Sequence, residues 1–318
     1  MVFRAGQRLA SVAVRFPPLP DTGLYGFESL QQFEGAVLLL VAMADGDSHT
    51  FGSAVLVEKG IALAAGHVIQ HHADQGHFEG DWVMYAFGPA TNGMHCWAVA
   101  GITFSAVGYI AVLTLHYAAD MGEELKLHYF EMSARLPRVG EIVTALGFRS
   151  LEPIIGADPD VGLEPAEGLF LGSSGPVLDV WPGGRDRLIA PRPCFAADLR
   201  TVGAMSGGPV LDSRGKVVGI VTSSNDDGDG DAYTLSTMIW DGLGIKVVAL
   251  WPPHAFWPQE PTALISLADV EDGWRLHWSD DGAQYRYQGG VDGPDATLYA
   301  PFDPAPDPLT AFSRNSQS

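Results

Sequence analysis

The chain has 318 residues, 47% of them hydrophobic, and a formal net charge of −20 at pH 7, because 38 Asp and Glu residues outnumber 18 Lys and Arg residues. This length and apolar content predict a globular protein of one large domain or two modest ones and exclude general disorder. The acidic balance disfavours binding to a nucleic-acid backbone or to an anionic membrane surface, since both attract Lys and Arg.

The cysteine count and the apolar runs bear on where the protein works. Cys96 and Cys194 are the only cysteines, too few for the disulfide framework of a small secreted protein. No run reaches the roughly 18 apolar residues of a membrane span, and the N-terminus lacks the apolar core of a signal peptide. We therefore expect a cytoplasmic protein with two buried free thiols, and a single bridge between them is the alternative.

Short apolar runs separated by Gly and Pro follow one another through most of the chain. Runs of this length without a helical period are typical of strands in an all-β barrel or sandwich. Two short stretches, 67–72 and 234–242, have helical potential. The predicted strands are 36–44, 51–57, 61–65, 83–87, 97–104, 109–115, 142–148, 169–171, 177–180, 208–211 and 216–222.

The C-terminal stretch 251–318 is acidic and rich in aromatic residues. It contains a predicted hairpin, in which an Asp-Gly turn joins strands at 274–278 and 283–287. We expect its aromatic residues to pack across the strands as a small core, and a carbohydrate- or peptide-binding face is the alternative. They are Trp274, Trp278, Tyr285 and Tyr287.

Three regions follow from these changes in composition. Residues 1–35 form an N-terminal extension, residues 36–250 the main domain, and residues 251–318 a C-terminal extension. The end of that extension is rich in Pro and then in Ser, Asn and Gln, which predicts disorder there.

The sharpest motif is GAMSGGPVL at residues 203–211. Small residues around Ser206 let the backbone approach a bound carbonyl group closely, and backbone N–H groups beside such a serine can form an oxyanion hole. A serine hydroxyl alone is a weak nucleophile and needs a base. His67 lies at the end of a buried predicted strand and is the candidate base.

Four segments together resemble the chymotrypsin-like (trypsin-like) serine peptidases, and most closely the disulfide-poor bacterial branch that includes the HtrA-type enzymes. The resemblance covers about residues 36–250 and implies two antiparallel six-stranded β-barrels with the active site between them, to which we add a small C-terminal β extension. The segments are FGSAVLV (51–57), AGHV (65–68), SGGPV (206–210) and VGIV (218–221).

The resemblance also implies roles for individual residues. Ser206 is the nucleophile and His67 the general base, while the backbone N–H groups of Ala204 and Ser206 form the oxyanion hole. The family usually has Gly where this chain has Ala204, which predicts a less mobile peptide there. No cofactor and no metal ion are implied. The expected partner is a protein or peptide substrate, and a regulatory protein partner is a further option.

Tyr109 stands where the family places the acid that orients the histidine. A neutral tyrosine gives the imidazolium no charge stabilisation. Three interpretations follow: a Ser–His dyad with Tyr109 or water orienting His67, a carboxylate supplied from another strand or loop, or a catalytically dead relative. The local carboxylates are Asp74, Glu79, Asp81 and Asp120.

The leading hypothesis is therefore a serine endopeptidase that hydrolyses peptide bonds through an acyl-enzyme on Ser206. The alternative is a catalytically impaired pseudo-peptidase that binds a peptide or protein without cutting it.

The expected substrate-binding residues follow from the same family layout. Arg200 lies at the predicted floor of the specificity pocket, while Thr222, Ser223 and Ser224 pair with the substrate backbone as an added strand. Arg200 on that floor would attract an acidic side chain. The alternative is an Arg200 that faces solvent, and the net charge of −20 favours basic or neutral substrates.

Three further motifs receive structural interpretations. The segment 171–179 echoes the Ser206 motif but lacks its second Gly, so we interpret it as a coincidental combination of strand and turn. His67, His71, His72 and His77 are crowded together, but the Glu of a zinc-helix motif is absent, so we expect a solvated loop. The segment 225–231 matches the first half of a calcium loop and lacks its final Glu, which favours an acidic solvent loop over weak Ca²⁺ binding.

Overall fold

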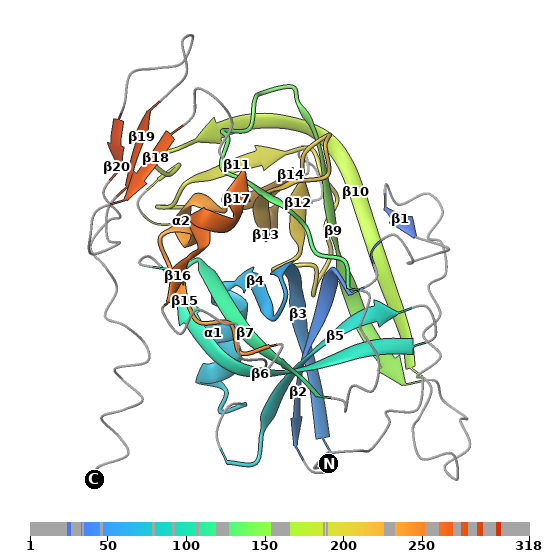
Figure 1. Cartoon of the computed structure of the whole chain (residues 1–318). Helices are drawn as coiled ribbons and strands as arrows, with labels where there is room; N and C mark the ends of the chain where they lie inside the picture. Colours follow the sequence, from blue (N-terminus) through green and yellow to red (C-terminus); the bar gives the residue numbers. More distant parts are fainter. Residues whose placement is uncertain are drawn as a thin grey trace.

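The structure is a computed structural model of the chain and shows an all-β molecule built around two barrels (Figure 1). Within the described ranges, no helix is both long enough and apolar enough to cross a membrane. The described residues are 24–26, 33, 35–44, 47–77, 80–90, 93–105, 108–118, 127–153, 166–186, 188, 190–225, 233–251, 261–269, 275–278, 285–288 and 297–299.

Six antiparallel strands close into the first barrel, in blue to green in Figure 1. They are β2 (Val37–Ala44), β3 (Asp47–Glu58), β4 (Ile61–Ala65), β5 (Val83–Ala90), β6 (Gly93–Phe104) and β7 (Ile110–Tyr117). They pair in the order β2-β3-β4-β7-β6-β5, and β5 pairs back onto β2. The helix α1 (Gly66–Asp74) follows β4 directly.

The second barrel is also a ring of six antiparallel strands. They are β9 (Ile142–Pro153), β10 (Ala166–Trp181), β11 (Cys194–Ala197), β12 (Pro209–Leu211), β13 (Val217–Asn225) and β14 (Tyr233–Met238). The order is β12-β9-β10-β11-β14-β13, and β12 pairs with β13 to close the ring. The predicted fold of two six-stranded barrels is confirmed.

Short elements extend this framework. Strand β1 (Tyr25–Gly26) pairs with β10, β8 (Met132–Ser133) runs parallel to β13, and β17 (Ala268–Asp269) runs parallel to β8. After the second barrel come α2 (Trp240–Leu243), β15 (Lys246–Val247), β16 (Thr262–Ala263) and the 3-10 helix η3 (Leu264–Leu267).

The C-terminal hairpin is present. Strands β18 (Arg275–Trp278) and β19 (Tyr285–Gln288) pair antiparallel with Trp278 opposite Tyr285, and β20 (Thr297–Tyr299) adds a third strand. The packing of the aromatic side chains, the predicted disordered end and most of the N-terminal extension lie outside the described residues. The three-region division stays a prediction.

Two predicted elements differ from the structure. The runs 169–171 and 177–180 belong to one long strand, β10, because the Gly and Ser residues between them pair without interruption with β9. The segment 234–242, expected to be helical, is mostly strand β14, and only α2 after it is helical. Strand β11 was not predicted.

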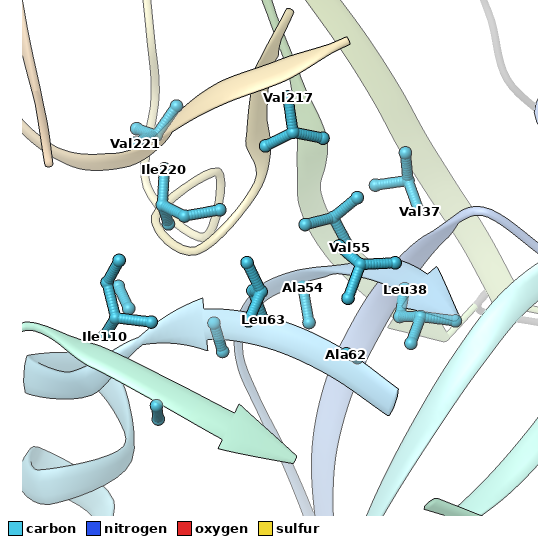
Figure 2. Close-up of a cluster of buried hydrophobic side chains, with 14 of the residues drawn as sticks. Val37, Leu38, Ala54, Val55, Ala62, Leu63, Ile110, Val217, Ile220 and Val221 are labelled. Carbon is cyan, nitrogen blue, oxygen red and sulfur yellow. The ribbon is translucent and has the colours of Figure 1, made fainter. Parts of the chain in front are cut away.

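Apolar side chains from both barrels form one core. Figure 2 shows Val217, Ile220 and Val221 of β13 in the same cluster as Val55 of β3 and Leu63 of β4. This explains why residues 37–42 of β2 and all of β4 are buried: one face fills the first barrel while the other packs toward its neighbours. The loops that carry the predicted site meet at this junction.

Candidate active site

The junction between β4 and α1 positions His67. Gly66 donates its N–H to the carbonyl oxygen of Tyr109 at 2.9 Å. A Cβ at residue 66 would clash with the carbonyl oxygen of Gly108, so glycine is needed for this close approach. His67 therefore enters the first turn of α1 beside Tyr109, which directly precedes β7.

The Ser206 segment packs against the first barrel. The Ser53 N–H of β3 donates to the carbonyl oxygen of Ser206 at 2.9 Å. Gly207 has φ +92°, and a Cβ there would clash with the carbonyl oxygen of Ser53 and lie 3.1 Å from the backbone nitrogen of Ala65. Since Ala65 lies two residues before His67, the fold brings Ser206 and His67 into one neighbourhood.

The two side chains are not yet joined. In the described part of the chain, no hydrogen bond links the Ser206 hydroxyl to the His67 ring. Such bonds are often long in unliganded enzymes and tighten when substrate binds. The side chain of Ser206 is partly exposed and that of His67 is exposed, so both reach the surface where a peptide would lie.

Ala204 has the backbone conformation expected of a glycine. Its φ is +68°, and no other described non-glycine residue has a positive φ. This left-handed conformation costs a residue with a Cβ about 1–2 kcal/mol. The Ser53 hydroxyl donates a hydrogen bond to the carbonyl oxygen of Ala204 at 2.8 Å, and this bond helps to hold the peptide.

Arg192 lies against Tyr109, the residue that the sequence motifs predict in the position of the family's acid. Its side chain is buried, and its guanidinium carbon lies 3.9 Å from the centre of the Tyr109 ring. It also donates hydrogen bonds to the hydroxyls of Thr237 at 2.6 Å and Thr222 at 3.0 Å. A positive charge therefore lies on the face of Tyr109 and acts on His67.

The surroundings of His67 disfavour its protonated form. Its pKa is lowered from 6.5 to about 4, first by burial of part of the ring and then by the charges of Arg192 and His71. All three effects oppose an imidazolium. His67 is therefore neutral at pH 7 and free to accept a proton, but the cation that would result is poorly stabilised.

A buried carboxylate lies close by but holds the backbone instead. Asp241 of α2 accepts a hydrogen bond from the Ser105 hydroxyl at 2.5 Å, and the backbone N–H groups of Tyr109 and Ile110 also stabilise its charge. Burial nevertheless raises its pKa from 3.8 to about 6. Asp241 is not among the groups that shift the pKa of His67. Its hydrogen bonds instead hold the start of β7.

The four local carboxylates proposed from the sequence lie elsewhere or outside the described residues. Asp74 is exposed at the end of α1 and accepts a hydrogen bond from Gln70 at 2.8 Å. Asp81 is exposed before β5, while Glu79 and Asp120 are not described. A third residue supplied by a carboxylate stays a prediction.

The predicted substrate-binding residues lie around the same junction. Thr222 is buried, and its hydroxyl accepts from Arg192 and donates to the carbonyl oxygen of Leu235. Ser223 and Ser224 are exposed on β13, beyond the residues that pair with β12. The side chain of Arg200 is also exposed, so recognition of an acidic substrate there stays a prediction.

The remaining sequence motifs can also be compared with the fold. Ser173 and Ser174 lie inside strand β10, so the echo of the Ser206 motif is coincidental, but the turn expected there is wrong. The histidine cluster is not a loop as expected, because His67, His71 and His72 lie on helix α1. The rings of His49, His72 and His77 stack, with 2.7 Å between the Nδ1 atoms of His72 and His77. The described residues contain no group of three or more side chains suited to a metal ion, and 226–231 of the calcium-like loop are not described.

Sequence reasoning missed Ser53, Arg192 and Asp241. Ser53 lies within the FGSAVLV segment, so the motif signalled a site, though not the contact with Ala204. Arg192 and Asp241 carry no motif, and their placement beside Tyr109 depends on strands far apart in the sequence.

Comparison with known proteins supplies the family. The sequence profile of the trypsin-like peptidase domain matches residues 52–220, more than half of the chain. No curated protein matches significantly. The family's histidine and serine positions, as read from the sequence motifs, both fall within the matched range.

Three solved structures illustrate the similarity. The Rv3671c protease of M. tuberculosis, active form, is 14% identical with a TM-score of 0.46, and the match covers 77% of this chain and 92% of that one. The MamO protease domain of Magnetospirillum magneticum is 14% identical with a TM-score of 0.43, and the match covers 64% of this chain and 92% of that one. Deg5 is 21% identical with a TM-score of 0.42, and the match covers 64% of this chain and 85% of that one. The assignment rests on the profile match: the chain belongs to the trypsin-like peptidase domain family.

Proposed function

We propose that the protein is a serine endopeptidase that cleaves protein or peptide substrates through an acyl-enzyme. The observation that carries this proposal is the seating of the Ser206 segment on β3 and against Ala65, two residues before His67. A serine hydroxyl near a neutral imidazole is the minimum that this chemistry requires, and the closeness of the two segments supports that pairing.

The reaction would proceed in two halves. Neutral His67 removes the proton from the Ser206 hydroxyl as its oxygen attacks the substrate carbonyl carbon, and the N–H groups of Ala204 and Ser206 bind the resulting oxyanion. His67 then gives that proton to the leaving amine as the peptide bond breaks. Water, deprotonated by His67, attacks the acyl-enzyme, and the returned proton restores Ser206.

A fluorophosphonate probe tests the nucleophile. We expect the wild type to be labelled and Ser206→Ala to lose labelling. Ser174→Ala is the matched control, because Ser174 belongs to the similar segment inside β10 and its loss should leave labelling intact. Equal labelling of wild type and Ser206→Ala would contradict the proposal.

A second candidate function is a binding module that holds an extended peptide without cleaving it. The contact of Arg192 with Tyr109 and the low pKa of His67 favour it, since both disfavour the imidazolium that cleavage requires. Incubation with a mixture of unmodified peptides separates the two functions. Multiple-turnover cleavage that depends on Ser206 would exclude a pure binding module, whereas saturable binding without cleavage would support one.

A further inference from the structure

Ser53 connects three parts of the molecule at the candidate site. It lies on β3, and its side chain is fully buried. Its hydroxyl donates to the carbonyl oxygen of Ala204 at 2.8 Å and accepts from the N–H of Phe148, on β9, at 2.9 Å. Its own N–H donates to the carbonyl oxygen of Ser206 at 2.9 Å. One residue of the first barrel thus holds the carbonyl groups of Ala204 and Ser206, which lie on either side of Met205.

The contact matters because the conformation it holds is unfavourable. Ala204 has φ +68°, which an alanine leaves readily unless the surroundings oppose it. The peptide unit between Ala204 and Met205 is held at both ends: the Ser53 hydroxyl donates to its carbonyl oxygen, and the Met205 N–H donates to the carbonyl oxygen of Val202 at 3.1 Å. Loss of the Ser53 bond removes one of these two restraints on its rotation. Rotation there would also reorient the neighbouring N–H groups of Ala204 and Ser206.

We propose that Ser53 is a positioning residue that keeps the Ala204–Ser206 segment in the shape that binds an oxyanion. This proposal rests on the proposed function of the site, in which the N–H groups of Ala204 and Ser206 receive that charge. Ser53 does not touch the substrate. It acts through Ala204, and the acceptor bond from Phe148 orients its hydroxyl proton toward the Ala204 carbonyl oxygen.

The first experiment measures peptide cleavage by Ser53→Ala. We expect kcat to fall on the order of 10- to 100-fold with KM nearly unchanged, because the oxyanion hole acts in the transition state. Affinity for a peptide boronate, whose tetrahedral adduct occupies the hole, should fall by a similar factor. Ser133→Ala, at another fully buried serine in β8, is the matched control and should keep both values.

Two further variants separate positioning from general stability. Ser53→Cys keeps a weak donor of similar size and should lie between wild type and Ser53→Ala. Ala204→Gly introduced into Ser53→Ala relieves the left-handed strain, so it should restore part of kcat without restoring the melting temperature lost with the Phe148 contact. A kcat that follows only the melting temperature across these variants would overturn the proposal.

A readout independent of activity keeps this proposal apart from the proposed function. Hydrogen–deuterium exchange of the peptide covering 203–207 should be faster in Ser53→Ala than in wild type or Ser133→Ala. Unchanged exchange there would overturn the role of Ser53 even in an active peptidase. Faster exchange in a protein that the fluorophosphonate probe never labels would show that Ser53 holds Ala204 in place. It would also show that this contact does not serve catalysis.

Discussion

At the scale of single residues, the charge beside His67 decides how well the site can work. In the family, an acid stabilises the imidazolium, and in the well-studied serine protease case its loss lowers kcat about 10⁴-fold. The sequence motifs predict Tyr109 in the position of that acid, and the Arg192 guanidinium lies on the face of the Tyr109 ring. We therefore expect slow turnover with a pH dependence unlike that of a complete triad.

The pH dependence of kcat/KM, or of the labelling rate, follows from the pKa of His67. The neutral ring is the reactive form, so the rate should fall as the pH drops below the pKa, here about 4. We call this fall in rate at low pH the acid limb. Arg192→Gln removes a cation, so the acid limb should move to higher pH. Its midpoint should stay below 6.5, because the burial of His67 remains. Rates measured from pH 3.5 to 8 locate the limb.

Arg185→Gln is the control for that experiment. Arg185 also stacks on aromatic rings, those of Trp181 and Tyr233, but it does not contribute to the pKa of His67. Its acid limb should coincide with that of the wild type. Coincident limbs for Arg192→Gln and wild type would show that Arg192 does not act on His67.

Restoring the acid should require two changes. In Tyr109→Asp the new carboxylate would pair with Arg192, whose guanidinium lies against the present ring, so the single variant should gain less than about tenfold in kcat. Tyr109→Asp with Arg192→Gln frees the carboxylate for His67 and should gain on the order of 10²-fold or more. Steady-state kinetics of both variants measure this, and equal gains would refute the pairing.

At the scale of elements, the placement of the Ser206 turn depends on one glycine. Gly207→Ala would force a Cβ into the carbonyl oxygen of Ser53 and push the turn off β3. A displacement of about 1 Å can cost a catalytic site about 10²-fold, so we expect labelling to slow by at least that factor. The free energy of unfolding, from urea denaturation, should fall by roughly 3 kcal/mol or more.

Gly215→Ala is the matched control. Gly215 also has a positive φ, +78°, but a Cβ there meets nothing within 4 Å. This variant should lose only about 1–2 kcal/mol of stability for its backbone conformation and keep its labelling rate. Similar labelling by both variants would mean that the contact with Ser53 does not position Ser206.

The same elements show what the sequence could and could not predict. Strand β4 matches its prediction to the residue, because an apolar run bounded by Gly admits few other structures. Strand β14 was missed because it buries the hydroxyls of Thr234, Ser236 and Thr237 beside its apolar Leu235 and Met238. Thr234 donates to the carbonyl oxygen of Leu199, and Thr237 accepts from Arg192. Such partners lie 35 to 45 residues away and leave no local pattern.

The residues of the candidate site also divide into those that the sequence could predict and those that it could not. The motifs around His67 and Ser206 are local, so the sequence predicted their pairing, and the fold places the two segments together. The roles of Ser53, Arg192 and Asp241 arise from contacts between strands of different barrels or distant loops. Residues of this kind are identified only when the register of both barrels is known.

At the scale of the whole molecule, the two barrels share one apolar core and each barrel carries one cysteine. Cys96 lies on β6 and Cys194 on β11; both are buried and free. The fold is therefore held by its apolar core without a disulfide, as the low cysteine count predicts. The molecule should accordingly be indifferent to the redox state of its surroundings.

Thiol chemistry tests this view of the molecule. Burial raises the pKa of Cys96 to about 12 and also raises the pKa of Cys194, so almost no thiolate, the reactive form, is present at pH 8. A disulfide reagent such as DTNB should modify neither cysteine in the folded protein and both in denaturant. Dithiothreitol should leave the melting temperature unchanged. A lower melting temperature under reducing conditions would reveal a stabilising bridge and contradict a fold held together by its core alone.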